Sequence, residues 1–344
     1  MIQNKINDKK AFYFQWHFTE NCNLRCIHCY QEDYVYKDLS DEKIFSIADI
    51  INNSLNKWNK YGRVSLTGGE PFLRKNILYK LLDYFENAEQ VYWLGILSNG
   101  TLIDEVDATR LKNYSKLKEV QISIDGATSK SHDRIRGAGN FSKAIRAIQV
   151  LEQHNIPVSM MFTLHRENSK EALQVTKLAE DLEINALTIE RIVSMNDDNV
   201  HKFYMSAKEL ETQYQQIYHL KKQIETRSAL KIRVSRPLWV LTDENLGGFC
   251  PAGFSSLAIL HDGTVLPCRR LEIPIGNILT DGLFKIWYTS DVLWNLRDKR
   301  KLGENCRNCQ YLPRCGGCRA VAYQMTGDYM ADDPQCWKIT KGVQ

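Results

Sequence analysis

Hydrophobic residues between positions 11 and 190 follow two alternating patterns. Short runs rich in β-branched and aromatic residues predict strands, which cover Ala11–Phe18, Arg63–Thr67, Tyr92–Ser98, Glu119–Ile124, Val158–Thr163 and Ala186–Glu190. Between them apolar residues recur at helical spacing, and the predicted helices are Asp41–Trp58, Ile77–Phe85, Glu105–Asn113, Phe141–His154 and Ser169–Leu182. Repeated strand–helix units imply a parallel sheet whose functional side chains lie at the C-terminal ends of the strands. An open doubly wound sheet would show the same periodicity, and a full barrel of eight units is not visible.

The pattern changes after residue 195. A helix is predicted at Ser206–Thr226, and its apolar face, which we interpret as core or interdomain packing, consists of Leu210, Tyr214, Ile217, Tyr218 and Ile224. Further on, Ser255–Leu260 and Thr264–Arg269 flank a His-Asp-Gly turn and predict a β-hairpin. Because 344 residues exceed what one hydrophobic core usually organises, we expect more than one domain.

Composition narrows the class of protein. Charged residues make up 25% of the chain, as in ordinary globular proteins. A net charge of +4 gives no case for nucleic-acid or membrane binding. Met1–Lys10 is polar and lacks the apolar region of a secretory signal, and the most apolar run, Val91–Leu97, is too short to span a bilayer. Ten cysteines without an export signal therefore favour metal ligation in a reducing cytoplasm over disulfides.

Three of these cysteines lie directly after the first predicted strand. Cys22, Cys26 and Cys29 have the spacing C-x3-C-x2-C, and thiolates at this distance suit zinc or an iron–sulfur cluster. A structural zinc site would need a fourth ligand, and the only candidate in the loop is His28, which lies between two thiols where its ring can hardly turn back. A cubane cluster with three thiolates and one open iron fits better, while a zinc knuckle is the alternative.

Polar residues follow the next predicted strands. Thr67-Gly68-Gly69-Glu70-Pro71 comes after the second, where the glycines let the backbone approach a ligand closely and the carboxylate can accept from an ammonium group. The third and fourth strands end in Ser98-Asn99-Gly100 and Ser123-Ile124-Asp125. Each of these segments could equally be a simple turn.

The other seven cysteines lie in the tail, at Cys250, Cys268, Cys306, Cys309, Cys315, Cys318 and Cys336. C-x2-C is also a zinc spacing, so a pair of zinc ribbons is one interpretation. The neighbouring Arg307, Arg314 and Arg319 would even allow an RNA-binding knuckle.

The Cys22–Cys29 loop resembles the signature of radical S-adenosylmethionine (SAM) enzymes, and Gly68-Gly69-Glu70 resembles the GGE motif of that family. The resemblance implies a partial (β/α)6 barrel. It also implies that Gly68, Gly69 and Glu70 contact the methionyl amino group of SAM. Ribose and carboxylate contacts would come from Ser98, Asn99, Ser123 and Asp125. Arg134 or Arg136 of the segment 132–137 could pair with the SAM carboxylate, or the segment could be a solvated helix start; Arg136 is taken as the candidate.

The tail is similar to the SPASM extension of these enzymes, which holds two auxiliary [4Fe–4S] clusters. The similarity implies that Cys306, Cys309, Cys315 and Cys336 surround one cluster, and that Cys250, Cys268 and Cys318 hold the other with an open or non-Cys position. Two departures stand out. Cys315-Gly316-Gly317-Cys318 has C-x2-C where the family often has C-x3-C. Arg269 replaces the Asp that sulfatase-maturing relatives use as a base, which argues against sulfatase maturation.

The resemblance implies three [4Fe–4S] clusters and three segments: a radical SAM barrel over residues 1–195, a helical connector over 196–248 and a SPASM domain over 249–344. SAM cleavage at the Cys22/Cys26/Cys29 cluster would yield a 5′-deoxyadenosyl radical that takes a hydrogen from the substrate. We expect a cytoplasmic maturase that crosslinks a ribosomal peptide. The short segment before Ala11 either weakens this interpretation or requires a separate leader-binding protein.

A flavodoxin- or ferredoxin-type reductant is expected as a partner, with no nucleic acid and no membrane. The alternative substrate is a tetrapyrrole, because the segment from Cys315 to Pro334 also resembles enzymes of alternative haem and haem d1 synthesis. A non-enzymatic reading, an electron carrier or zinc adaptor, would leave Gly68-Gly69-Glu70 without a role.

Overall fold

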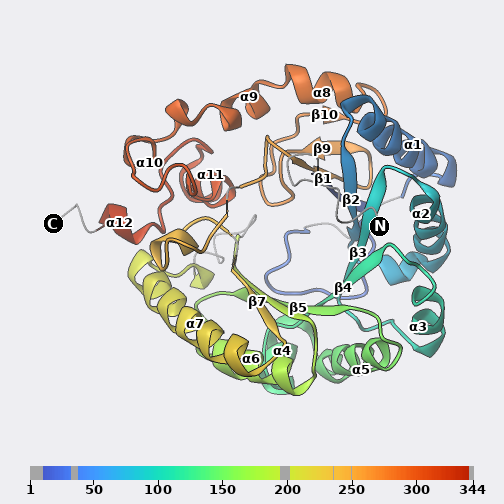
Figure 1. The fold of residues 1–344 in the computed structure, drawn as a ribbon, viewed down its shortest axis with the longest axis horizontal. Helices are drawn as coiled ribbons and strands as arrows, with labels where there is room; N and C mark the ends of the chain where they lie inside the picture. Colours follow the sequence, from blue (N-terminus) through green and yellow to red (C-terminus); the bar gives the residue numbers. More distant parts are fainter. Residues whose placement is uncertain (1–10, 32–37, 194–201, 235, 249, 341–344) are drawn as a thin grey trace.

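The computed structural model describes residues 11–31, 38–193, 202–234, 236–248 and 250–340. The described residues form one sheet of ten strands in the order β10-β9-β8-β1-β2-β3-β4-β5-β6-β7, with helices around its outer side (Figure 1). The strands are β1 (Ala11–Thr19), β2 (Tyr61–Gly68), β3 (Val91–Ser98), β4 (Leu117–Ser123), β5 (Val158–Leu164), β6 (Ala186–Arg191), β7 (Lys231–Arg233), β8 (Ser256–Ile259), β9 (Thr264–Leu266) and β10 (Gly276–Asn277).

Strands β1 to β6 pair in parallel, each with the next, as the sequence predicts. The helices between them are α1 (Asp41–Trp58), α2 (Lys75–Asn87), α3 (Glu105–Leu111), α4 (Ser129–Arg136), α5 (Asn140–Gln153) and α6 (Ala172–Asp181). A 3-10 turn over Ser169–Glu171 precedes α6, so this helix starts three residues later than predicted. The partial parallel barrel expected from the sequence is therefore confirmed. No helix among the described residues has both the length and the apolarity that crossing a bilayer requires.

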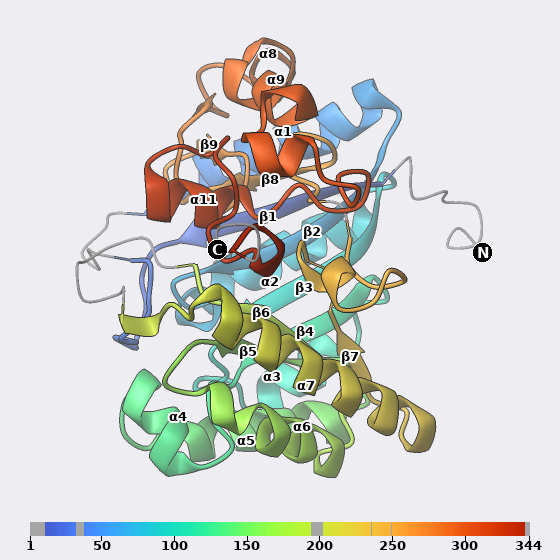
Figure 2. The same ribbon diagram turned by 90° about the vertical axis from the view of Figure 1, so that its left-hand side faces the viewer.

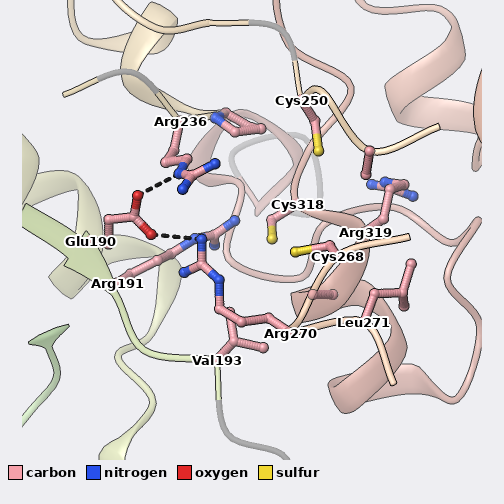
Figure 3. A pocket seen from close by; sticks show the side chains of 13 residues that line it. Glu190, Arg191, Val193, Arg236, Cys250, Cys268, Arg270, Leu271, Cys318 and Arg319 are labelled. Atoms are coloured by element: carbon pink, nitrogen blue, oxygen red, sulfur yellow. Dashed lines mark hydrogen bonds and ion pairs between the residues drawn. The ribbon is translucent and has the colours of Figure 1, made fainter. Parts of the chain in front are cut away.

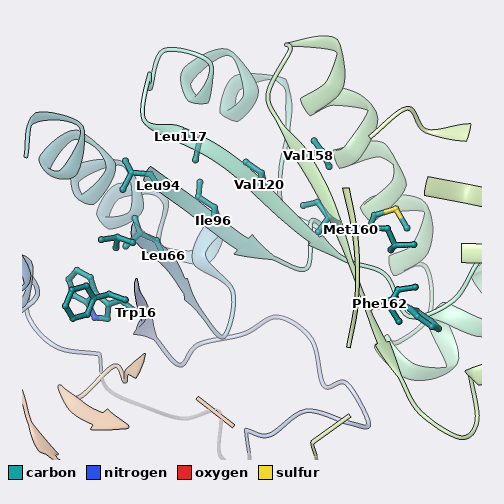
Figure 4. Packing of buried hydrophobic residues seen from close by; sticks show 14 of the residues in the cluster. Trp16, Leu66, Leu94, Ile96, Leu117, Val120, Val158, Met160 and Phe162 are labelled. Carbon is teal, nitrogen blue, oxygen red and sulfur yellow. The ribbon is translucent and has the colours of Figure 1, made fainter. Parts of the chain in front are cut away.

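Alternation along the strands gives the sheet two different faces. The side chains that point outward are fully or almost fully buried against the helices (Figure 4), among them Trp16, Leu66, Ile96, Val120, Met160 and Phe162. The residues between them point into the barrel and are mostly polar: Tyr13, Gln15, Arg63, Ser65, Glu119, Gln121, Ser159 and Thr188. The apolar core therefore lies between sheet and helices, while the interior of the barrel is left to polar groups.

The rest of the chain joins this sheet at both ends. The predicted hairpin forms β8 and β9, which are antiparallel, and β8 also pairs in parallel with β1. At the other edge, β7 follows the long helix α7 (Ala207–Arg227) and pairs with β6. The tail continues through α8 (Leu283–Thr289), α9 (Asp291–Arg297), α10 (Glu304–Arg307), α11 (Arg319–Thr326) and α12 (Trp337–Thr340), which lie beside the barrel (Figure 2). One sheet thus contains strands from all three expected domains. The division into these domains stays a prediction, and its boundary at residue 195 lies outside the described residues.

A buried ion pair fastens the tail to the end of β6. The Arg191 guanidinium binds both carboxylate oxygens of Asp333, and one of its nitrogens donates to Oε1 of Gln335 at 2.7 Å. Asp333 also accepts the backbone N–H of Cys318 at 2.8 Å. Burial by itself would raise the pKa of Asp333, but Arg191 and these hydrogen bonds hold it below its ordinary value.

Arg191→Met is expected to destabilise the protein by about 3–5 kcal/mol, because it leaves the buried carboxylate of Asp333 without its cation. The matched control is Arg227→Met, which removes an exposed pair with Glu180 and should leave the free energy of unfolding almost unchanged, because solvent screens this pair. Urea unfolding followed by circular dichroism under anaerobic conditions measures both. Equal losses in the two variants would contradict the role given to Arg191.

Candidate cluster and cofactor site

The loop that carries Cys22, Cys26 and Cys29 is held against the end of β2 by backbone contacts. Gly69 N–H donates to the Thr19 carbonyl at 2.9 Å, and Glu70 N–H donates to the Asn21 carbonyl at 2.8 Å. A Cβ on Gly68 would lie 2.1 Å from the Thr19 oxygen, and one on Gly69 would lie 2.3 Å from the Asn21 oxygen. The two glycines are thus required by the approach of the protein's own backbone, a reason that the motif alone does not reveal.

The three thiols of this loop are close enough to affect one another's ionisation. Burial chiefly, with Cys26 and Cys29 among the lesser causes, raises the pKa of Cys22 to about 11. Backbone N–H groups of Leu24 and Gln31 donate to the sulfurs of Cys22 and Cys29 at 3.4 Å. Such hydrogen bonds are typical of thiolates on an iron–sulfur cluster, and metal coordination deprotonates a thiol outright.

Within the described ranges, no group of three or more His, Cys, Asp or Glu side chains is placed to hold one metal ion.

Glu70 joins the ends of β2 and β3. Its fully buried carboxylate accepts hydrogen bonds from Phe72 N–H at 3.0 Å, Ser98 Oγ at 2.8 Å and Asn99 N–H at 2.8 Å. Burial raises the pKa of Glu70 to about 7, although these three bonds oppose the shift. A carboxylate has about four acceptor positions, so one receives no hydrogen bond from the described residues. The Asn99 amide nitrogen lies 4.0 Å from the Cys22 sulfur, which places the end of β3 beside the cysteine loop.

Asp125 connects the loop to β5 and α4. Its carboxylate accepts from His28 Nε2 at 2.7 Å, Arg136 Nε at 2.5 Å and Thr163 N–H at 3.0 Å. Burial would raise the pKa of Asp125, but Arg136 and His28 hold it far below its ordinary value. The His28 ring thus faces Asp125.

The two arginines of the segment 132–137 lie in different surroundings. A terminal guanidinium nitrogen of Arg136 lies 3.9 Å from the Cys26 sulfur, whereas Arg134 is exposed beside Glu167.

The ends of β1 to β4 therefore gather most of the predicted site residues around the loop. Ser98, Asn99, Asp125 and Arg136 contact the loop or Glu70, and Ser123 ends β4 two residues before Asp125.

The sequence analysis did not predict two features near this site. His165, fully buried after β5, has no hydrogen-bond partner for either ring nitrogen among the described residues. The Arg269 guanidinium lies 3.9 Å from the centre of the Tyr30 ring, which links the residues next to Cys268 and Cys29.

A second set of thiols lines a pocket between β6 and the tail. Cys250, Cys268 and Cys318 point into the same space (Figure 3). Glu190, at the end of β6, pairs there with Arg236 and, at 2.6 Å, with Arg270. Guanidinium groups beside the thiols favour an anionic occupant, such as a thiolate-bound cluster.

The remaining thiols lie around the Asp332-Asp333 turn. Asp332 accepts the Cys306 backbone N–H at 2.7 Å, and Cys336 N–H donates to the Asp333 carbonyl at 3.0 Å. Burial, with Cys315 among the lesser causes, raises the pKa of Cys336 to about 11. Cys309 follows Cys306 on one turn, with its N–H bonded to the Cys306 carbonyl at 3.3 Å.

Solved structures of similar fold include anSMEcpe and SuiB. The chain superposes on anSMEcpe with bound AdoMet with a TM-score of 0.76 at 20% identity, covering 96% of this chain and 95% of that one. It superposes on SuiB of Streptococcus suis bound to precursor peptide SuiA with a TM-score of 0.73 at 15% identity, covering 96% and 76%. At these identities the likeness concerns the fold.

Sequence comparison gives relatives along most of the chain. The AdoMet-dependent heme synthase of Methanosarcina barkeri is 28% identical over 93% of this chain and 95% of its own length. That of Nitratidesulfovibrio vulgaris is 29% identical over 93% and 90%. The subtilosin biosynthesis protein AlbA of Bacillus subtilis is 28% identical over 87% of this chain and 65% of its own length.

Residues 16–179 match the radical SAM superfamily, and residues 250–310 match the iron–sulfur cluster-binding domain called SPASM. These ranges contain the cysteine loop with its surrounding strand ends and the first cysteines of the tail. The chain therefore combines a radical SAM domain with a C-terminal SPASM domain.

Proposed function

We propose that Cys22, Cys26 and Cys29 hold a [4Fe–4S] cluster with an open iron, and that SAM binds beside it. The observation that carries this proposal is the convergence of three thiols with Glu70, Asn99 and Arg136 at one edge of the parallel sheet. Reduced by one electron, bound SAM supplies a 5′-deoxyadenosyl radical that removes a hydrogen atom from the substrate.

The surrounding side chains orient this cofactor. The remaining acceptor position of the Glu70 carboxylate suits the SAM ammonium group. Arg136 is fixed by Asp125 through its Nε, and its terminal nitrogens are directed toward the loop, where they suit the SAM carboxylate. Gly68 and Gly69 bring the β2 backbone to the loop, and Ser98, Asn99 and Ser123 provide hydroxyl and amide groups at the ends of β3 and β4.

The tail would hold two auxiliary [4Fe–4S] clusters. Cys250, Cys268 and Cys318 supply thiolates for one, next to Arg236 and Arg270. The other ligand set is Cys306, Cys309, Cys315 and Cys336. Nearby positive charge raises the reduction potential of a cluster, so the first set suits acceptance of an electron from the substrate.

The substrate that we propose is a ribosomal peptide that becomes crosslinked. AlbA and the SuiB complex with its precursor peptide support this class. Arg269 stands where a base would take a proton in sulfatase maturation, and a guanidinium cannot accept one. A leader-binding protein and a flavodoxin- or ferredoxin-type reductant would assist, in the cytoplasm.

A second candidate substrate is a tetrapyrrole, modified at a propionate side chain. The observation that favours it is the extent of the likeness to the heme synthases, which covers 86–95% of their length. The two candidates share the radical step and differ in the molecule that enters the barrel.

Replacing Cys22, Cys26 and Cys29 together by Ala is expected to abolish 5′-deoxyadenosine formation from SAM and dithionite. It should also lower the iron content from about twelve to about eight per chain. Chromatography and iron analysis of anaerobic protein measure both. The control, Ala at Cys250, Cys268 and Cys318, should lose the same amount of iron and still form 5′-deoxyadenosine. A colourless wild type that contains zinc, or turnover by the first variant, would contradict the proposal.

Affinity for SAM is expected to rise as pH increases toward about 7 and to level off above it. Burial raises the pKa of Glu70 to about 7, and only the ionised carboxylate attracts the ammonium group. Below that pKa, affinity should fall by up to about tenfold per pH unit. Equilibrium dialysis with the cluster-loaded enzyme measures this profile. Glu70→Gln should bind SAM more weakly with a flat profile, and an unchanged profile in this variant would assign the titration to another group.

The mass of the product, measured by mass spectrometry, identifies the class of substrate. Anaerobic enzyme, SAM and reductant are incubated in parallel with a cysteine-containing precursor peptide and with a porphyrin that carries propionates. Loss of two hydrogens from the peptide is expected for a crosslink. Change in the porphyrin alone would replace the peptide by the second candidate.

A further inference from the structure

The interior face of the sheet holds a charged cluster that the radical chemistry leaves unexplained. It consists of Tyr13 on β1, Arg63 on β2, Trp93 on β3, Glu119 on β4 and Arg233 on β7. Except for Glu119, these side chains are partly exposed, whereas their neighbours on the outward face are buried. Most of these inward-pointing side chains are therefore accessible to solvent.

Arg63 is held in place by aromatic rings. Gly95 leaves room for Trp93 to lie along the interior face, since a Cβ there would be 2.4 Å from the indole ring. The Arg63 guanidinium lies 4.5 Å from the centre of the Trp93 ring and 5.9 Å from that of Tyr13. The Tyr13 hydroxyl is fixed by a hydrogen bond of 2.9 Å to Ser65. This arrangement orients the guanidinium before any ligand arrives.

Arg63 also has no carboxylate partner among the described residues. Its Nε is buried without a hydrogen-bond partner among the described residues. The nearby carboxylate, Glu119, is already occupied by Arg233 and by the Ser159 hydroxyl at 2.5 Å. Glu119 therefore leaves the positive charge of Arg63 unpaired. Leaving a buried donor unsatisfied is costly unless a ligand completes it.

We propose that Arg63, together with Arg233, binds a carboxylate of the substrate inside the barrel. The planar guanidinium matches a carboxylate in two parallel hydrogen bonds. This inference rests on the proposed function, because it assumes that the substrate enters the barrel. The carboxylate could be a propionate of a tetrapyrrole or an acidic side chain of a peptide. A guanidinium group binds both in the same way, because both are carboxylates.

The test is binding to the cluster-loaded enzyme without turnover. The probes are a porphyrin tetracarboxylate, its methyl ester, an acidic peptide, and the same peptide with Gln for Glu. We expect one of the acids to bind and its neutral analogue to bind at least about tenfold more weakly. Which acid binds identifies the source of the carboxylate. Equal binding of acid and neutral analogue in both pairs, or binding of neither acid, would overturn the inference.

Arg63→Gln should weaken binding of the acid by about tenfold or more and leave binding of the neutral analogue unchanged. Arg63→Lys should retain part of the affinity, since it keeps the charge and loses the paired geometry. The control Arg146→Gln removes an exposed arginine of α5 and should have no effect. Equal affinity of the Gln variant and the control would contradict the role of Arg63.

Formation of 5′-deoxyadenosine without substrate separates the two proposals. Arg63→Gln should retain it, because Arg63 lies toward the start of β2, away from the Cys22–Cys29 loop at the opposite end. If the wild type forms no 5′-deoxyadenosine, the proposed function is wrong. The binding experiment would still test whether Arg63 binds a carboxylate.

Discussion

Two backbone hydrogen bonds between the end of β2 and the chain after β1 determine the position of the N-terminal site. They bring Gly69 to Thr19 and Glu70 to Asn21, in a contact too close for any side chain at residues 68 and 69. The cysteine loop therefore starts from a fixed point above the strand ends. From there, the Glu70 carboxylate reaches the end of β3, and Asp125 reaches β5, α4 and His28. One buried carboxylate thus ties the ends of β2 and β3, and a second ties the ends of β4 and β5.

Such carboxylates are expensive to bury, and their different surroundings give them different states. Asp125 faces a guanidinium and an imidazole, so its negative charge is stabilised and its pKa is low. Glu70 receives only neutral donors, and burial raises its pKa to about 7. Asp125 can therefore serve as a permanent anchor for Arg136. Glu70 gains its full charge most readily when a cation arrives, which is the behaviour expected of a ligand-binding carboxylate.

The sequence predicted the strands and helices of the barrel well, because each strand alternates between an apolar outward and a polar inward face. It also predicted which strand ends meet, since a parallel sheet leaves little freedom there. Pairing of β8 with β1 was not predictable: β8 has four residues, and its partner lies more than two hundred residues earlier. The Arg191–Asp333 pair, separated by 142 residues, has no local signal either. His28 was considered only as a ligand, and its partner Asp125 lies 97 residues away.

The two faces of the sheet also explain how one fold can keep its radical chemistry and change its substrate. Outward residues such as Trp16 and Phe162 are fully buried against helices, so their replacement costs stability. Inward residues contribute little to that core. Arg63, Glu119 and Arg233 can thus vary without disturbing the strand ends that hold the cysteine loop. The relatives of this chain carry names that refer to haem synthesis and to peptide maturation. The polar interior, whose side chains can be exchanged, is the part of the molecule where that difference can arise. In this chain, the interior contains Arg63, which has no carboxylate partner among the described residues.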